Sequence, residues 1–186
     1  MTPVVQTAVH RRLWALVAIL AALPGPVYAQ APTSDTAVKA AMLYNFTKFI
    51  EWPAIDGGRP VTLCVVGRTA IADALVQSVR GKLIAGRTLS VTAMASDKTL
   101  SSCDVVFIDA SETQRSAPAL KTLRTQPVLT VSDGKNFART DGISEFYVED
   151  GRLRFVINTD AARRAGLQIS SRLLGLAKIV RDGDAP

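Results

Sequence analysis

Few side chains in this sequence can carry chemistry. Its 186 residues include two cysteines, Cys64 and Cys103, and a single histidine, His10. His10 lies within residues 1–29, a segment with the features of a secretory signal. Removal of that segment leaves a chain without histidine. Such a chain can build neither a Ser-His-Asp nor a Cys-His constellation, and it offers no histidine ligand to a metal ion.

The N-terminal segment, residues 1–29, is predicted to be a cleaved signal peptide. A pair of arginines precedes an uninterrupted apolar run at residues 13–23, and Pro24-Gly25-Pro26 breaks that run before the small-residue site ending at Ala29. The run is shorter than the roughly 20 residues that a helix needs to cross a bilayer. We therefore expect cleavage after Ala29, export across the membrane, and no stable membrane insertion afterwards.

The remaining residues, 30–186, are predicted to form a single domain. About 157 residues are enough to bury a core, and no repeat or linker divides them. Removing the signal lowers the formal net charge from +6 to +4, because the signal holds two arginines and no acidic residue. Basic residues do not cluster with aromatic ones, so we expect no nucleic-acid partner.

The two cysteines are expected to form a disulfide. Cys64 lies within a predicted strand, Cys103 stands just before another, 39 residues later, and an exported chain enters an oxidising compartment. Closing a loop of this length would stabilise the fold by about 4 kcal/mol in the chain-entropy model. A structural bond and a redox-responsive bond both remain open, because the second requires strain or exposure, which the sequence does not reveal.

Motifs for cofactors are missing from the sequence. Gly67-Arg68-Thr69 does not match a dinucleotide fingerprint, and no phosphate loop occurs. Asp104, Asp109 and Asp133 stand near predicted strand ends, as in a phosphoreceiver pocket, but the first strand ends without an acidic pair. We predict turn and cap roles for them. We expect no cofactor, no metal site and no enzymatic activity, although composition alone leaves Ser-Lys and two-carboxylate hydrolases open.

The predicted elements alternate between helix and strand. A first helix runs from residue 34 or 35 to about Ile50, and a hairpin turns at Asp150-Gly151. The other predicted helices cover residues 69–80, 111–125 and 170–181, and the predicted strands cover residues 61–66, 88–94, 104–108, 127–131, 143–148 and 152–157. This order predicts an α/β fold, a three-layer sandwich with a mainly parallel sheet and a C-terminal antiparallel hairpin at its edge.

Two apolar helices supply candidate contacts to a partner. In the first helix, an apolar stripe at helical spacing is expected to face the core; it comprises Val38, Ala41, Met42, Asn45, Phe46 and Phe49. The candidate partner contacts are Tyr44, Phe46, Lys48, Phe49, Trp52, Leu173, Leu174 and Leu176. Trp52 is the strongest of them, because it follows the helix in a Trp-Pro context where an exposed aromatic ring could anchor a partner.

Six blocks of the sequence carry a resemblance to a known family. They are residues 39–53 (KAAMLYNFTKFIEWP), 63–67, 103–108, 128–132, 154–158 and 167–177 (LQISSRLLGLA). In order and spacing they resemble the YfiR family of periplasmic proteins, the DUF4154 domain. The resemblance implies a repressor that binds the periplasmic domain of an inner-membrane diguanylate cyclase and lowers cyclic di-GMP and biofilm formation. It also implies that Cys64 and Cys103 form the family's structural disulfide, and that a homodimer can form.

Two features depart from the family's pattern. The best-understood member has a second cysteine pair tied to its redox response, and this chain has no cysteine left to supply one. Redox control through a second bond is therefore not implied here. Where relatives often carry a Gly-Gly pair, this chain has Asp141-Gly142, which we interpret as turn variation.

A second hypothesis is a periplasmic small-molecule-binding sensor that acts on another membrane partner. Its crevice would lie at the carboxyl ends of the strands, around residues 67–69, 109–111 and 132–133. The candidate ligand contacts are Arg68, Asp133, Arg152 and Arg154. Arg152 and Arg154 share one side of a predicted strand and could hold an anion there.

Overall fold

A computed structural model describes residues 35–53, 58–67, 69–96 and 98–184 of the protein. Their helices are α2 (Asp35–Phe49), α3 (Thr69–Val79), the 3-10 helix η2 (Ala110–Glu112), α4 (Thr113–Leu123), α5 (Phe137–Thr140), α6 (Thr159–Arg164) and α7 (Ser171–Leu174). Their strands are β1 (Ile50–Glu51), β2 (Val61–Val66), β3 (Leu83–Ile84), β4 (Arg87–Met94), β5 (Val105–Ile108), β6 (Leu129–Ser132), β7 (Ser144–Glu149), β8 (Arg152–Asn158), β9 (Gln168–Ile169) and β10 (Lys178–Val180). The predicted signal peptide and Arg68 lie outside the described residues.

Eight strands form one mainly parallel sheet in the order β10-β8-β7-β6-β5-β2-β4-β3. Strands β4, β2, β5, β6 and β7 run parallel, whereas β8 is antiparallel to β7 and β3 is antiparallel to β4. A separate two-stranded sheet joins β1 to β9. In this order β4 lies on one side of β2 and β5 on the other. The chain therefore crosses from one side of β2 to the other between β4 and β5.

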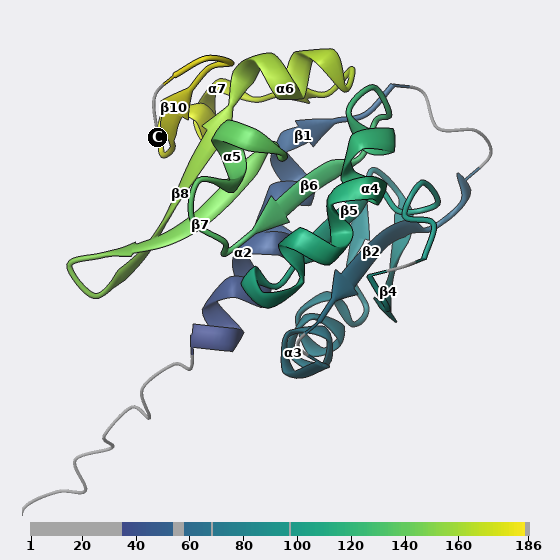
Figure 1. The fold of residues 1–186 in the computed structure, drawn as a ribbon. Helices are drawn as coiled ribbons and strands as arrows, with labels where there is room; N and C mark the ends of the chain where they lie inside the picture. Colours follow the sequence, from purple (N-terminus) through teal and green to yellow (C-terminus); the bar gives the residue numbers. More distant parts are fainter. Residues whose placement is uncertain (1–34, 54–57, 68, 97, 185–186) are drawn as a thin grey trace, which may run out of the picture. The chain divides into compact units, whose positions relative to one another are not determined.

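Helices cover both faces of this sheet (Figure 1). One face packs under α2 and α3 and buries Leu63 and Val65 of β2, while the other packs under α4 and buries Cys64 and Val66 of the same strand. A strand buried on both faces reads as a continuous apolar run, which is why β2 shows no alternation in the sequence. The predicted three-layer α/β sandwich is confirmed.

The buried side of α2 differs from the predicted stripe. Lys39, Ala40, Leu43, Phe46 and Thr47 are the buried residues of this helix. The predicted core-facing stripe was therefore wrong for most of its residues. Ala41 is exposed, and of the six residues only Phe46 is fully buried. The helix packs against α3 as well as against the sheet, so partial burial spreads around most of its circumference.

The C-terminal hairpin forms as predicted but does not end the sheet. Asp150 and Gly151 both have positive φ, 51° and 69°, as a two-residue type I′ turn requires. The predicted helix over residues 170–181 was wrong, because α7 ends at Leu174 and the chain continues as β10. The backbone of β10 pairs in parallel with β8. This long-range pairing makes β10, and not the hairpin, the edge of the sheet.

Candidate functional site

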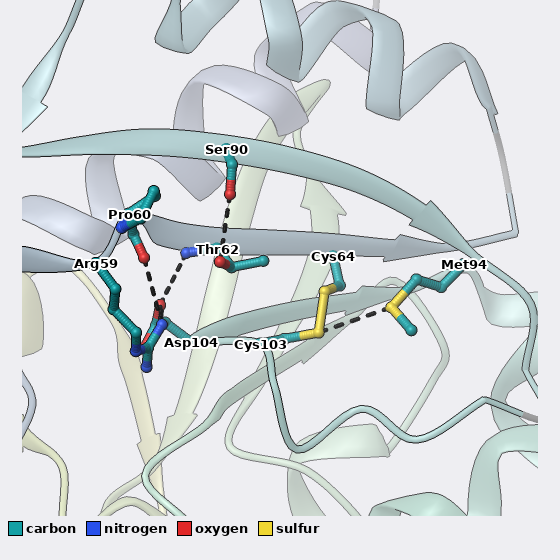
Figure 2. Close-up of a disulfide and its surroundings, with 8 residues drawn as sticks. All are labelled: Arg59, Pro60, Thr62, Cys64, Ser90, Met94, Cys103 and Asp104. Carbon is teal, nitrogen blue, oxygen red and sulfur yellow. Dashed lines mark hydrogen bonds and ion pairs between the residues drawn. A yellow bond between two sulfur atoms is a disulfide. The ribbon is translucent and has the colours of Figure 1, made fainter. Parts of the chain in front are cut away.

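The predicted disulfide between Cys64 and Cys103 is confirmed (Figure 2). It links β2 to the residue pair that precedes β5, with a Cα–Cα distance of 6.0 Å. Both cysteines are 2% exposed, and the Met94 sulfur lies 3.7 Å from the Cys103 sulfur. Because reductants reach exposed bonds first, this burial favours a structural bond over a redox-responsive one.

Asp104, the residue after Cys103, holds three chain segments together. Its carboxylate accepts two hydrogen bonds from the Arg59 guanidinium, at 2.9 and 2.7 Å, and one from the Thr62 amide at 2.8 Å. Its backbone carbonyl accepts a hydrogen bond from the Trp52 indole at 3.3 Å. The carboxylate is therefore fully engaged, and Figure 2 shows it beside the disulfide. Its place is structural, as predicted for the strand-end aspartates.

The other two aspartates lie at the carboxyl ends of the strands. Asp109 accepts hydrogen bonds from the Ser111 amide and hydroxyl and caps η2. Asp133 accepts a hydrogen bond from the Ala110 amide at 2.8 Å and forms an ion pair with the Lys39 ammonium at 2.9 Å. Lys39 also pairs with Asp35 at 2.7 Å. The predicted cap role is thus confirmed for Asp109, whereas Asp133, like Asp104, joins distant segments, and both oxygens of the Asp133 carboxylate have protein partners.

The Lys39 ammonium is stabilised in its charged form. Burial favours the neutral amine, but the hydrogen bonds to Asp35 and Asp133 outweigh it and raise the pKa of Lys39 above the ordinary 10.5. A raised pKa in the folded state means that this group stabilises the fold fully below pH 10.5, and that its contribution disappears as the pH rises through the folded-state pKa.

We therefore predict a pH-dependent effect of the Lys39→Met substitution. Between neutral pH and pH 10.5 the variant melts at a lower temperature than the wild type, by an amount that does not change with pH, since Asp133 has lost its cation. At higher pH the difference shrinks. Circular dichroism melts across the alkaline range measure it, with Lys121→Met, an exposed lysine of α4, as the control. A difference that grows with pH would contradict the assignment.

Of the predicted ligand contacts, two lie on the exposed part of the hairpin. Arg152 and Arg154 are both exposed, and the Arg154 guanidinium lies 3.9 Å from the Glu149 carboxylate. Both lie on β8, whereas Asp133 follows β6 and is already paired with Lys39. The anion grip that their spacing suggested stays a prediction without support from the geometry.

Two predicted partner contacts are buried. Phe46 has no exposed surface, and its ring packs 5.1 Å from that of Phe155 and 5.7 Å from that of Phe146. Leu173 is 3% exposed. These two residues belong to the core and cannot contact a partner in this conformation. Their apolar character comes from helix packing, as is usual for a stripe at helical spacing.

The remaining predicted contacts come from two segments that the fold brings together. β1 pairs antiparallel with β9, and the Ser170 amide donates a hydrogen bond to the Phe49 carbonyl at 2.9 Å. The end of α2 therefore lies beside the start of α7. We define the amino-edge surface as Tyr44, Lys48, Phe49, Trp52, Leu174 and Leu176. Lys48 and Leu176 are exposed and the other four are half-buried.

Two hollows and two lysine ammonium groups lie next to residues of the amino-edge surface. Trp52 borders a hollow of about 240 Å³ with Ile84 and Arg87, and Leu174 borders one of about 110 Å³ with Ile169 and Leu167. Two ammonium groups lie over the Tyr44 ring, that of Lys48 at 4.7 Å and that of Lys82 at 4.2 Å from the ring centre. The hollow-lining residues outside the two predicted helices were missed, since only the folded chain places them beside Trp52 and Leu174.

The family model for YfiR/HmsC-like proteins, DUF4154, matches residues 36–178, from the first turn of α2 to the start of β10. The chain belongs to the YfiR/HmsC-like family. This is a family of periplasmic regulators and not of enzymes. Among the residues that the structure describes, no helix is long and apolar enough to span a membrane. Nor do their acidic, cysteine and histidine side chains gather in a group that could hold a metal ion.

Proposed function

We propose that this YfiR/HmsC-like protein binds the periplasmic domain of an inner-membrane diguanylate cyclase and represses it, which lowers cyclic di-GMP and biofilm formation. The observation that carries the proposal is the family match over residues 36–178. The sequence supports it, because a chain without histidine after residue 29 lacks the usual catalytic constellations. We further propose that residues 1–29 are cleaved after Ala29 as the protein reaches the periplasm.

A repressor of this kind needs no chemistry of its own. It acts by binding one conformation of the cyclase more tightly than another, and so shifts the population toward the conformation that it binds. The difference between the two binding free energies sets the largest shift it can produce. Repression therefore depends on the surface that contacts the cyclase, and substitutions on that surface should weaken it in proportion to the binding energy lost.

We propose the amino-edge surface as the docking site. It combines half-buried aromatic rings, Trp52 and Tyr44, with the exposed apolar Leu176, and aromatic side chains are enriched at protein interfaces. The indole of Trp52 is fixed by its hydrogen bond to Asp104, so ordering this ring on binding costs little entropy. The basic residues Lys48, Lys82 and Arg87 fit a partner surface that carries acidic side chains.

Deletion of the gene is expected to raise cellular cyclic di-GMP, and a plasmid copy should reverse the rise. A plasmid carrying Leu176→Asp should fail to reverse it, because Leu176 is 73% exposed and a carboxylate there would oppose an apolar contact. Loss of one central contact of this kind lowers affinity by about tenfold or more. The matched control is Val148→Asp on the hairpin, which is 64% exposed and lies outside the amino-edge surface.

Two results would contradict the proposal. Unchanged cyclic di-GMP after deletion would remove the cyclase as a target and favour the sensor hypothesis. Full complementation by Leu176→Asp, with the variant present at wild-type level, would move the docking site elsewhere on the molecule. A homodimer also stays a prediction, which sedimentation of the purified protein would test.

A further inference from the structure

A hollow lies away from the amino-edge surface, at the carboxyl ends of β5 and β6. It has a volume of about 320 Å³ and lies between α4 and the segment that contains α5. The side chains that matter here are Thr113, Gln114 and Ala117 of α4, with Lys135, Phe137 and Asp141. The volume is within the range of small-molecule sites, and open α/β sheets bind their ligands at this end of the strands.

The wall formed by Phe137 is fixed by a glycine. Phe137 is 3% exposed, and a Cβ atom at position 142 would lie 1.8 Å from a carbon of its ring. Any side chain at Gly142 would therefore displace the ring. The Asp141-Gly142 pair was interpreted from the sequence as turn variation. Its glycine has a steric role, because it leaves room for the Phe137 ring, which lines the cavity together with Ala117.

The charges around this cavity do not cancel. The Asp141 carboxylate has the Arg124 guanidinium at 3.7 Å, so its negative charge has a counter-ion. Lys135 is exposed, and within the described residues its ammonium makes no ion pair or hydrogen bond. The Gln114 amide likewise has no hydrogen-bond partner there. The cavity therefore offers one uncompensated cation and one open amide next to an apolar wall.

We propose that this cavity binds a small organic anion, a carboxylate with a compact aromatic or aliphatic body. The carboxylate pairs with Lys135 and accepts a hydrogen bond from Gln114, while the body packs against Phe137 and Ala117. A neutral molecule of the same shape would leave the Lys135 charge uncompensated, so the negative charge supplies much of the selectivity. This binding does not depend on the proposed repression of a cyclase.

Thermal melts of the purified protein with benzoate, phenylacetate or hexanoate, each compared with its neutral amide, test the proposal. At about 100 times its Kd, a bound carboxylate should raise Tm by roughly 5–10 °C, and the amide should raise it less. Lys135→Ala should abolish the shift, as should Ala117→Phe, which fills the cavity. Lys121→Ala removes an exposed lysine of α4 that does not line the cavity, and should leave the shift intact.

Three results would overturn the proposal: no saturable shift with any of the three carboxylates, equal shifts with acids and amides, or a full shift in Lys135→Ala. Lys135→Arg, which keeps the charge, should retain most of the shift and so separates loss of the cation from general damage. The measurement contains no cyclase. A negative result here would leave the proposed repressor function standing, and a failed deletion experiment would leave this site standing.

Discussion

Removal of the Cys64–Cys103 disulfide is expected to lower the free energy of unfolding by about 4 kcal/mol, which corresponds to roughly 8–16 °C in Tm. The bond closes a loop of sequence separation 39 and so restricts the unfolded chain. It also joins neighbouring strands of the core, where both cysteines are 2% exposed. A loss of this size is a large part of the ~5–15 kcal/mol that stabilises a typical domain.

The double substitution Cys64→Ala with Cys103→Ala measures this effect without burying new polar groups. Urea unfolding followed by circular dichroism gives the free energy of unfolding. The same titration of the wild type in the presence of a reductant should give a free energy close to that of the variant. The variant itself should not respond to the reductant, which is the control. A loss below about 1 kcal/mol would show that the chain-entropy argument does not hold here.

The second large effect is expected from Arg59→Met. It leaves the Asp104 carboxylate, which is 1% exposed, with the Thr62 amide as its remaining donor among the contacts described. Removing one partner of a buried pair costs about 3–5 kcal/mol, because the other charge stays buried without compensation. The Arg59 side chain is 45% exposed, so water replaces part of the lost interaction and we expect the lower end, about 3 kcal/mol.

Two further variants separate charge from packing at this position. Arg87→Met removes a neighbouring guanidinium that donates to the backbone carbonyls of Arg59 and Pro60, and should cost about 1 kcal/mol. Asp104→Asn in the Arg59→Met background should restore stability, because it removes the uncompensated charge. Additive effects of Arg59→Met and Asp104→Asn, measured by urea unfolding, would refute the coupling of these two residues.

Local signals predicted the central part of the fold well. The strands β2, β5 and β6 lie buried between two helical layers, so β5 is an unbroken apolar run and the other two carry only small hydroxyl residues, Thr62, Thr130 and Ser132, among their apolar ones. Asp150-Gly151 predicted the hairpin, because few residues other than these adopt positive φ readily. The disulfide was predicted from two cysteines, one within a predicted strand and one just before another, in a chain expected to be exported.

Long-range contacts explain most of what the sequence did not predict. Leu173, Leu174 and Leu176 have helical spacing, yet the helix stops and the chain pairs with β8, a strand more than twenty residues earlier. Lys39 is buried with its ammonium between Asp35, one turn earlier in α2, and Asp133, which comes from a segment 94 residues later. No local pattern encodes either arrangement, since each depends on a partner that only the fold supplies.

The candidate sites show the same limit. Trp52 and Leu174 were predicted separately, and the short β1–β9 pairing, two residues on each strand, is what places their segments side by side. The cavity around Lys135 was missed, although the carboxyl ends of the strands were the predicted location for a ligand. Its lining comes from Ala110 of η2, from α4 and from residues 134–141, and the steric role of Gly142 appears only once the Phe137 ring is in place.

The disulfide has a consequence for how the cell makes this protein. With two cysteines in the chain there is one intramolecular pairing, so an oxidised monomer cannot hold the wrong bond. Maturation in the periplasm therefore requires an oxidase that removes two electrons per molecule, but no isomerase to shuffle mispaired intermediates. Strains lacking the oxidase should accumulate the protein poorly, whereas strains lacking only the isomerase should produce it at normal yield.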